Sequence, residues 1–314
     1  MTAATSTDLR RLGDRHVFPI GLGAMPLSWE GMLDDRERAL ATVHAALDAG
    51  VTHLDTANIY SPSWEHVGHN EALVAEALRT WSGDAASVVV ATKGGIVLGP
   101  DGAGRDASRD GLRRACEASL AALGRDQVDV YYLHRHDPSL PFAEQVANLV
   151  ALREAGLVRQ VAVSNVTPDM LSVALDVAGG PDDGGVVAVQ NEFSPRFRVD
   201  ADVITTCEQH GIAFVPWSPF GGAAQASEVG SRYAAFAEVA AAHDASAQQV
   251  ALAWLLSLSP VVVPIPGSTR PATITDSAAA ASLRLSDEEL RRLSATAPEG
   301  SSQYPDEEPA PPLR

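Results

Sequence analysis

Eight short apolar segments, each followed by a stretch with helical periodicity, run through this sequence of 314 residues. Near-continuous apolar runs are typical of parallel strands that are covered on both faces, and strict alternation with helices indicates βα units. Eight such units fill a chain of this length as one closed barrel. We therefore predict an α/β protein with a single (β/α)8 TIM-barrel domain over residues 1–314. The predicted strands are 20–25, 51–55, 88–92, 128–134, 158–164, 186–190, 212–216 and 261–264.

The helical stretches carry recognisable start and stop signals. Gly50, Gly124, Gly156 and Gly211 follow four of them directly and are candidate C-terminal caps. A ninth helix is expected over 287–295, behind Ser286 with Glu289 at capping-box spacing. The helices expected between strands are 34–49, 70–81, 108–123, 142–155, 168–177, 201–210, 247–258 and 271–283.

The two ends of the chain lie outside this alternation. Residues 9–18 are expected to form a small hairpin that closes the bottom of the barrel. Residues 298–314 are rich in Pro and acidic residues, which predicts an irregular C-terminal tail on the surface. No G-x-G-x-x-G sequence follows any predicted strand, so the dinucleotide fingerprint of open doubly wound sheets is missing.

Composition narrows the classes of partner. The formal net charge is −17, spread over helices and turns, which argues against nucleic acid or a membrane surface as partner. No apolar run approaches the ~20 residues of a membrane span, and the start lacks the apolar core of a secretory signal. Cys116 and Cys207 are too few for a disulfide framework, and Cys116 is expected to be a small buried residue. We expect a cytoplasmic monomer.

Polar side chains stand at the C-terminal ends of consecutive predicted strands, where TIM barrels place their active sites. Lys93 is notable because it is the only lysine among 23 basic residues. An arginine could not replace it where a compact ammonium must approach a hydroxyl. The strand-end residues are Asp55 with Tyr60, Lys93, His134, Ser164 with Asn165, Gln190, Trp217 with Ser218, and the turn 265–270.

Four of these residues form a coherent set for reducing a carbonyl. A carbonyl that accepts a hydride needs a proton on its oxygen, and a free tyrosine is a reluctant donor at neutral pH. An ammonium such as that of Lys93 stabilises the phenolate of Tyr60, and Asp55 would hold the ammonium in place. Neutral His134 would donate a hydrogen bond that orients the carbonyl. Taken singly, each residue could equally be the cap of a helix or loop or an ordinary residue of a pocket wall. Together, on neighbouring strands, they favour an active site.

The spaced motifs around these residues resemble the aldo-keto reductases from about Gly21 to Leu283. The motifs are Asp-Thr-Ala-Asn-Ile-Tyr (55–60), Ala-Thr-Lys (91–93), Leu-His (133–134), Val-Ser-Asn (163–165), Gln190, Trp-Ser-Pro-Phe-Gly (217–221) and Ile-Pro-Gly-Ser (265–268). The resemblance implies NADP(H)-dependent, reversible reduction of an aldehyde or ketone, with Tyr60 as general acid/base, Lys93 and Asp55 as its tuning pair, and His134 orienting the carbonyl. It further implies that Ser164, Asn165 and Gln190 bind the nicotinamide carboxamide and that Trp217 stacks on the ring, with Ser218 and Pro219 beside it.

The turn after the eighth strand is a candidate phosphate site. Gly267 allows close backbone approach, Ser268 and Thr269 offer hydroxyls, and Arg270 precedes a helix N-terminus. The resemblance implies that this turn meets the adenosine 2′-phosphate, so NADPH is expected over NADH. Asp276 is expected at the adenine end, where Thr275-Asp276-Ser277 replaces the family's usual acidic pair and Asn and leaves the strength of adenine binding open. Trp217 stands where Tyr is commoner in the family.

The substrate side is less determined. Trp29, Trp64, Phe220 and the C-terminal tail are candidates for the mouth of the pocket and suggest a hydrophobic or aromatic carbonyl compound. Three alternatives remain: a metal-dependent hydrolase built on the pairs His53/Asp55 and His134/His136, a Schiff-base lyase that uses Lys93, and a cofactor-sensing module without turnover. The expected site contains no metal.

Overall fold

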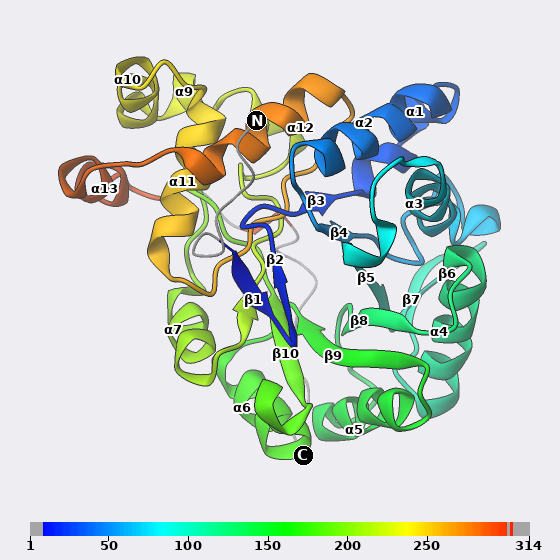
Figure 1. Cartoon of the computed structure of the whole chain (residues 1–314). Helices are drawn as coiled ribbons and strands as arrows, with labels where there is room; N and C mark the ends of the chain where they lie inside the picture. Colours follow the sequence, from blue (N-terminus) through cyan, green and yellow to red (C-terminus); the bar gives the residue numbers. More distant parts are fainter. Residues whose placement is uncertain (1–8, 300–301, 304–314) are drawn as a thin grey trace.

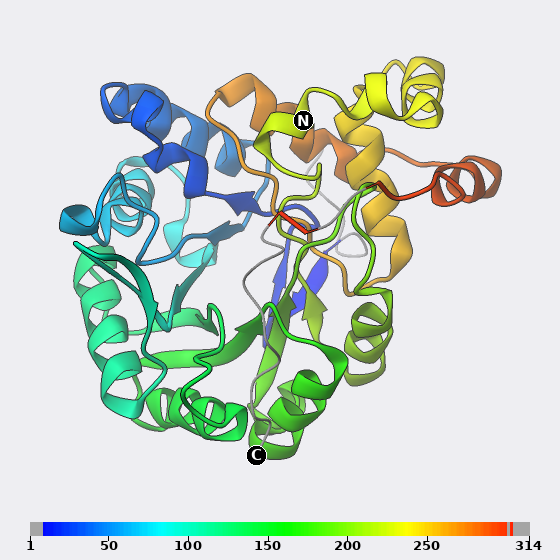
Figure 2. The same ribbon diagram turned by 180° about the vertical axis from the view of Figure 1, so that it is seen from behind.

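A computed structural model describes residues 9–299 and 302–303 and has a curled sheet of seven parallel strands with helices packed around it (Figures 1 and 2). The strand order is β11-β10-β9-β8-β5-β4-β3, so each strand pairs with the next one of the predicted series. The sheet strands are β3 (Leu22–Gly23), β4 (His53–Asp55), β5 (Val89–Gly94), β8 (Val128–Leu133), β9 (Val158–Ser164), β10 (Val186–Gln190) and β11 (Ala213–Phe214).

The predicted eighth strand closes the sheet through fewer hydrogen bonds than a regular strand. On one side, the amides of Val263 and Ile265 donate to β11 and to Pro216 beyond it, at 2.8 and 3.3 Å. On the other side, the carbonyls of Pro264 and Pro266 accept from Gly21 and Gly23, at 2.9 and 3.1 Å. Because both residues that face β3 are prolines, they have no N–H to donate in return. The fold is therefore the predicted (β/α)8 barrel, with an irregular eighth segment.

The main helices lie close to their predicted bounds. Gly124 and Gly211 cap α4 and α7 in the left-handed region, at φ 62° and 64°, where glycine carries no Cβ penalty. Ser286 and Glu289 form the predicted capping box of α13. The helices that follow the strands are α2 (Arg36–Asp48), α3 (His69–Thr80), α4 (Arg109–Leu123), α5 (Phe142–Glu154), α6 (Pro168–Ala178), α7 (Ala201–His210), α11 (Ala247–Leu258) and α12 (Pro271–Ala279), with α13 (Asp287–Ser294) last.

Two insertions were not predicted, and both lie at the C-terminal end of the barrel. The antiparallel hairpin of β6 (Ile96–Gly99) and β7 (Gly102–Arg105) follows β5 directly. The short helices α8 (Ala223–Ala226), α9 (Val229–Arg232) and α10 (Ala234–Ala242) follow β11. The turn residues Gly-Pro-Asp-Gly (99–102) are a hairpin signal, and the alanine-rich run 234–242 favours a helix. Short elements also occur elsewhere: α1 (Glu30–Leu33), η1 (Met25–Ser28), η2 (Trp64–His66), η3 (Ala85–Ser87), η4 (Pro181–Asp183) and η5 (Ala280–Ser282).

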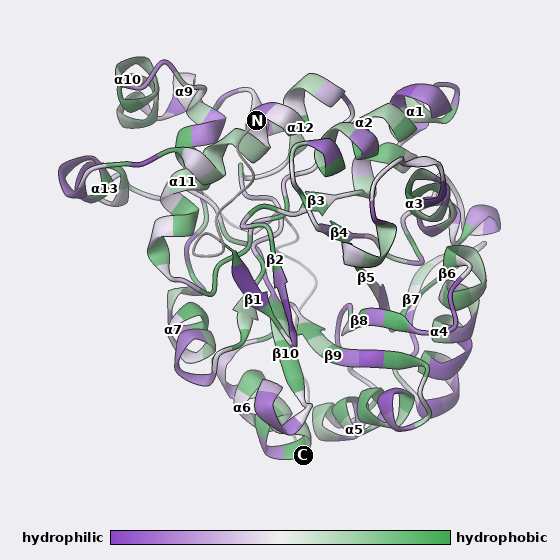
Figure 3. Ribbon diagram, viewed as in Figure 1, coloured by the Kyte–Doolittle hydropathy of each residue, from purple (hydrophilic) through white to green (hydrophobic). Residues whose placement is uncertain are grey.

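Apolar side chains fill both sides of the curled sheet. The larger cluster lies between the strands and the surrounding helices and includes Cys116 and Cys207, which are free and buried as small core residues. Figure 3 shows hydrophilic residues on the outer helices and also on parts of strands such as β9. Within the described residues, no helix has the length and apolar character needed to cross a bilayer.

A hairpin closes the bottom of the barrel, as predicted for residues 9–18. Strands β1 (Arg10–Leu12) and β2 (Arg15–Val17) pair antiparallel and lie across the barrel in Figure 1. Leu12 and Val17 are fully buried against inward-facing residues such as Val130 and Val215. The open end of the barrel is therefore the opposite one, at the C-terminal ends of the strands.

We predict that Val17→Ala lowers the free energy of unfolding by about 2 kcal/mol or more, because two buried methyl groups are lost and a cavity remains. The matched control is Val199→Ala, since Val199 is 69% exposed, and its effect should stay within about 0.5 kcal/mol. Urea unfolding followed by circular dichroism measures both. Equal effects of the two variants would show that the hairpin does not plug the barrel.

Candidate active site

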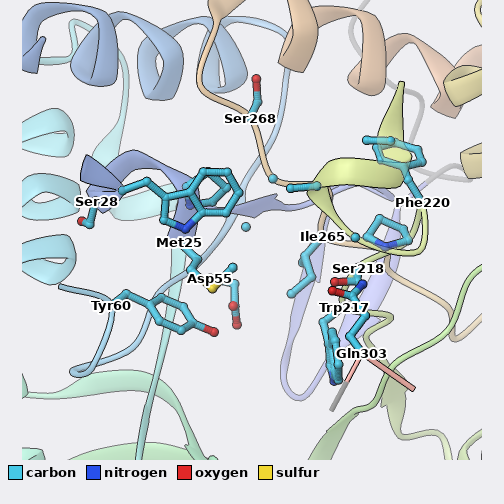
Figure 4. Close-up of a pocket in the computed structure, with 18 of the residues that line it drawn as sticks. Met25, Ser28, Asp55, Tyr60, Trp217, Ser218, Phe220, Ile265, Ser268 and Gln303 are labelled. Carbon is cyan, nitrogen blue, oxygen red and sulfur yellow. The ribbon is translucent and has the colours of Figure 1, made fainter. Parts of the chain in front are cut away.

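The predicted strand-end residues surround one cavity of about 1120 Å³ at the open end of the barrel (Figure 4). Tyr60 and Asp55 lie on one side of it, and Trp217, Ser218 and Gln303 lie on the other. Lys93 is fully buried behind the residues that line the cavity. Trp64, on η2, is 47% exposed and lies outside the cavity. The predicted residues that line the cavity are Trp29, Asp55, Tyr60, His134, Ser164, Asn165, Gln190, Trp217, Ser218, Pro219, Phe220, Gly267, Ser268, Thr269, Arg270 and Asp276.

Lys93 is the buried centre of the polar cluster. Its Nζ donates to Asp55 Oδ1 at 2.6 Å, to the Thr56 carbonyl at 2.8 Å and to Tyr60 Oη at 3.2 Å. These contacts use all three donors of an ammonium. Burial disfavours the charged form, but Asp55 and Tyr60 outweigh it and raise the pKa of Lys93 above its ordinary value. Lys93 therefore remains a cation in contact with the tyrosine hydroxyl.

Gln190 supports the same cluster from the opposite side of the barrel. Its Nε2 donates to Asp55 Oδ2 at 2.8 Å, so both carboxylate oxygens have partners. The sequence resemblance implied only a contact between Gln190 and the nicotinamide. The structure adds a positioning contact to Asp55, which is the kind of long-range pairing that only barrel closure can create.

His134 lies edge-on to Tyr60, with 5.8 Å between the ring centroids. Burial lowers the pKa of His134 far below its ordinary value, and the cations Lys93, Arg135 and Arg105 lower it further. The imidazole is therefore neutral at physiological pH. A neutral ring has one N–H donor, and the buried Nδ1 has no hydrogen-bond partner among the described residues.

Asn165 joins strand ends that are distant in sequence. It adopts φ 58°, a left-handed conformation that asparagine tolerates. Its Nδ2 donates to the His134 carbonyl at 3.0 Å and to Ser164 Oγ at 2.9 Å. Its Oδ1 accepts from Trp217 Nε1 at 3.1 Å. The amide thus holds the Trp217 ring on the wall opposite Tyr60.

The turn after the eighth strand forms the other end of the cavity. A Cβ at Gly267 would lie 2.7 Å from the Pro26 ring, so only glycine lets the two segments approach so closely. Ser268 Oγ donates to the Arg270 carbonyl at 2.9 Å and accepts from the Arg270 amide at 3.2 Å. These two hydrogen bonds fix the backbone of Arg270, which is exposed and is the N-cap residue of α12.

Asp276 is held by two neighbouring side chains. Its oxygens accept from Ser246 Oγ at 2.7 Å and from Gln249 Nε2 at 2.6 Å. Ser277, the next residue in the chain, is buried and also lines the cavity.

Several lining residues were not predicted, because they lie on segments whose position depends on the tertiary fold. Ile96, Ala103 and Arg105 come from the β6–β7 hairpin, and Arg135 directly follows His134. The Gly-Pro-Asp-Gly turn was the signal that could have revealed the hairpin.

Part of the predicted C-terminal tail also reaches the cavity. Gln303 lines it, while Ser302 Oγ and the Gln303 amide donate to Glu192 Oε2 at 2.8 and 3.0 Å. Glu192 is buried, so this contact holds residues 302–303 at the pocket, where the tail was expected. Residues 300–301 and 304–314 lie outside the described residues.

His53 lies on the same strand as Asp55 and is fully buried. Burial lowers its pKa to about 4, so it is neutral. Within residues 9–299 and 302–303, no group of three His, Cys, Asp or Glu side chains is placed to hold a metal ion. The pairs His53/Asp55 and His134/His136 therefore do not combine into a metal centre there.

Comparisons with known proteins point to one family. The model of the aldo/keto reductase family matches residues 19–297. An oxidoreductase of Schizosaccharomyces pombe is 34% identical over 287 residues, covering 90% of this chain and 88% of that protein. Pyridoxine 4-dehydrogenase of Escherichia coli is 34% identical over 298 residues, covering 92% and 98%. The aldo/keto reductase of Klebsiella pneumoniae solved with NADP and acetate superimposes with a TM-score of 0.77 at 27% identity, covering 94% and 98%.

We predict that Lys93→Met lowers the free energy of unfolding by about 3–5 kcal/mol, because Asp55 is left as an uncompensated buried charge. The control is Arg113→Met, which breaks the half-exposed pair with Glu117 and should cost at most about 0.5 kcal/mol. Urea unfolding at pH 7 compares them. Adding Asp55→Asn to Lys93→Met should restore part of the loss, and similar stabilities of Lys93→Met and Arg113→Met would contradict the analysis.

Proposed function

Because this chain belongs to the aldo/keto reductase family, whose members exchange a hydride between NADP(H) and a carbonyl group, we propose that it reduces aldehydes or ketones with Tyr60 as proton donor. The observation that carries the assignment of Tyr60 is the contact of its hydroxyl with the buried Lys93 ammonium, 3.2 Å away. Tyr60 also lines the cavity beside neutral His134.

The reaction requires a hydride and a proton, and residues of this chain donate the proton and stabilise the group that has lost it. NADPH, when bound, supplies the hydride to the carbonyl carbon. Tyr60 Oη donates its proton to the carbonyl oxygen, which becomes the hydroxyl of the alcohol. The phenolate left behind is stabilised by Lys93, while Asp55, which accepts a hydrogen bond from Gln190, holds that ammonium in place. A proton from solvent then restores Tyr60, and the reverse steps oxidise an alcohol.

His134 is proposed to orient the substrate. A neutral imidazole donates one hydrogen bond without competing for the proton that Tyr60 delivers. The lowered pKa of His134 therefore suits a hydrogen-bond donor better than a general acid. The carbonyl oxygen would lie between Tyr60 Oη and the His134 ring.

The polar groups of the cavity fit a nicotinamide cofactor along its length. Trp217 offers an aromatic face at the reacting end, and Ser164, Asn165 and Gln190 offer the donors and acceptors that a carboxamide requires. Ser268, Thr269 and Arg270 at the start of α12 offer hydroxyls and a guanidinium to a 2′-phosphate. Asp276 already bonds Ser246 and Gln249, and Ser277 is short, so contacts to the adenine are proposed to be weak.

Lys93 is poorly suited to the alternative of Schiff-base chemistry. An amine nucleophile must be neutral, and the neighbours of Lys93 keep it charged and engage all three of its donors. This favours a role in tuning Tyr60.

Tyr60→Phe is predicted to lower kcat for reduction of an aldehyde by about a thousandfold, because the proton donor is removed. Binding of NADPH, followed by tryptophan fluorescence, should change less than about twofold. Turnover near the original rate in this variant would assign the proton donor to another group.

The proposed phosphate site predicts a preference for NADPH over NADH that depends on Arg270. A charge-assisted contact of Arg270 with the 2′-phosphate is expected to make NADPH bind tenfold or more tightly, and Arg270→Ala should remove most of that difference. Fluorescence titration with both cofactors measures the ratio. Arg292→Ala, on α13, is the control, and an unchanged ratio in Arg270→Ala would reject the assignment.

A further inference from the structure

The segment between β4 and Tyr60 carries two of the three groups that accept hydrogen bonds from Lys93. Lys93 Nζ donates to the Thr56 carbonyl at 2.8 Å and to Tyr60 Oη at 3.2 Å. Residues 56–60 belong to no helix or strand, so a regular ladder of backbone hydrogen bonds does not hold them. The distance between the ammonium and the tyrosine hydroxyl therefore depends on what else fixes this segment.

Asn70, in the first turn of α3, contacts the segment at both ends. Its Oδ1 accepts from Thr56 Oγ1 at 2.6 Å, and its backbone amide donates to the Tyr60 carbonyl at 3.2 Å. The first amides of a helix have no partner within the helix, which leaves this N–H available to Tyr60. Between these two contacts, the Gly68 amide donates to the Asn58 carbonyl at 2.8 Å. The start of α3 therefore holds residues 56, 58 and 60.

The side chain of Asn70 is fixed in turn by the segment that follows β3. Its Nδ2 donates to the Ala24 carbonyl and to Ser28 Oγ, both at 2.8 Å. Ser28 lies on the same side of the cavity as Tyr60 (Figure 4). Asn70 is fully buried, and a buried amide that loses a partner is costly. The side chain can therefore not turn away from Thr56 without losing its other partners.

Glu71, the next residue of α3, contacts the neighbouring strand. Thr92 Oγ1 donates to Glu71 Oε1, and both side chains are fully buried. Thr92 directly precedes Lys93 on β5. In the same way, Thr56 directly follows Asp55, the last residue of β4. The first turn of α3 is therefore hydrogen-bonded to both strand ends that carry the buried ion pair.

Resting on the proposed function, we propose that Asn70 is a positioning residue, which acts through Thr56 to keep the Tyr60 hydroxyl in contact with the ammonium. Asn70 does not line the cavity, so its effect is indirect. A displaced Thr56 carbonyl would remove one of the contacts that fix Lys93 and let Nζ move away from Tyr60 Oη. The phenolate formed during reduction would then be less stabilised, which raises the pKa of Tyr60.

The variants Thr56→Val and Thr56→Ser test this role. Valine keeps the shape and the backbone carbonyl but removes the hydroxyl that Asn70 holds, whereas serine keeps the hydroxyl. With NADPH and benzaldehyde, Thr56→Val should slow hydride transfer in a single turnover about tenfold, because the proton donor is misaligned. Its KM should change less than about twofold, and Thr56→Ser should restore most of the rate.

The pKa of Tyr60 gives a readout that does not depend on turnover. In protein labelled with carbon-13 at Cζ of its five tyrosines, the NMR resonance lost in Tyr60→Phe identifies this residue. Thr56→Val should raise the pKa of Tyr60 by about 0.5–1 unit, which is part of the shift that one neighbouring charge can cause. Reduction should then persist to higher pH, since it needs the protonated hydroxyl, and Thr56→Ser should leave the pKa nearly unchanged.

Thr42→Val is the matched control. Thr42 is also fully buried, and its Oγ1 donates to the Arg38 carbonyl at 2.8 Å within α2, outside the lining of the cavity. Losing this hydroxyl should change neither the rate nor the pKa of Tyr60. Asn70→Ala should act in the same direction as Thr56→Val. Combining the two should add little to Asn70→Ala alone, because both break the same contact.

An unchanged pKa of Tyr60 in Thr56→Val would overturn the proposal, whatever the rate. Equal effects of Thr56→Val and Thr42→Val on that pKa would also overturn it, because they indicate a loss of packing. If the unmodified protein reduces no aldehyde, the proposed function fails, and the positioning role is then judged from the NMR titration alone. A pKa raised in Thr56→Val but not in Thr56→Ser or Thr42→Val would support the role, and equal values in all of them would reject it.

Discussion

The buried ion pair of Lys93 and Asp55 is the interaction on which the site depends. Removing two charges from water is costly, and a buried pair persists only where further hydrogen bonds satisfy both partners. Here the Thr56 carbonyl and the Tyr60 hydroxyl accept the remaining hydrogen bonds of the Lys93 ammonium, and Gln190 donates to the second oxygen of the Asp55 carboxylate. Asp55 ends β4, Lys93 lies on the neighbouring strand β5, and Thr56 and Tyr60 follow β4, whereas Gln190 ends β10 on another part of the barrel wall. The pair itself joins neighbouring strands, but its full set of partners requires the curled barrel, which brings Gln190 to Asp55.

The two ends of the barrel have opposite roles because of what covers them. The β1–β2 hairpin seals the bottom with Leu12 and Val17, so that end contributes stability. The top is bordered by the β6–β7 hairpin, the loop after β11 and residues 302–303. These segments are outside the repeating βα units, and they bring Arg105 and Gln303 to the cavity. The strand ends therefore supply the residues of the proposed proton transfer, and the inserted segments add side chains to the wall of the cavity.

Electrostatics separates the roles of neighbouring groups. The pKa of Lys93 is raised by Asp55 and Tyr60 in spite of burial, whereas burial and nearby cations lower the pKa of His134. One group therefore remains charged and the other neutral, although both contact or face the same tyrosine. This contrast supports a tuned proton donor beside a neutral hydrogen-bond donor, and it depends on the distances that the fold sets.

The sequence by itself determined the barrel, the order of its strands, the bottom hairpin and most of the residues that surround the cavity. It could do so because strand periodicity, helix caps and strand-end polarity are local signals. Only the tertiary structure decided that Pro264 and Pro266 make the eighth strand irregular, that Gln190 supports Asp55, that Trp64 lies outside the cavity and that Arg105 lines it. It also decided which residue of the expected tail, Gln303, reaches the cavity. These contacts join residues that are distant in the chain, and no local pattern encodes which of them the closed barrel brings together.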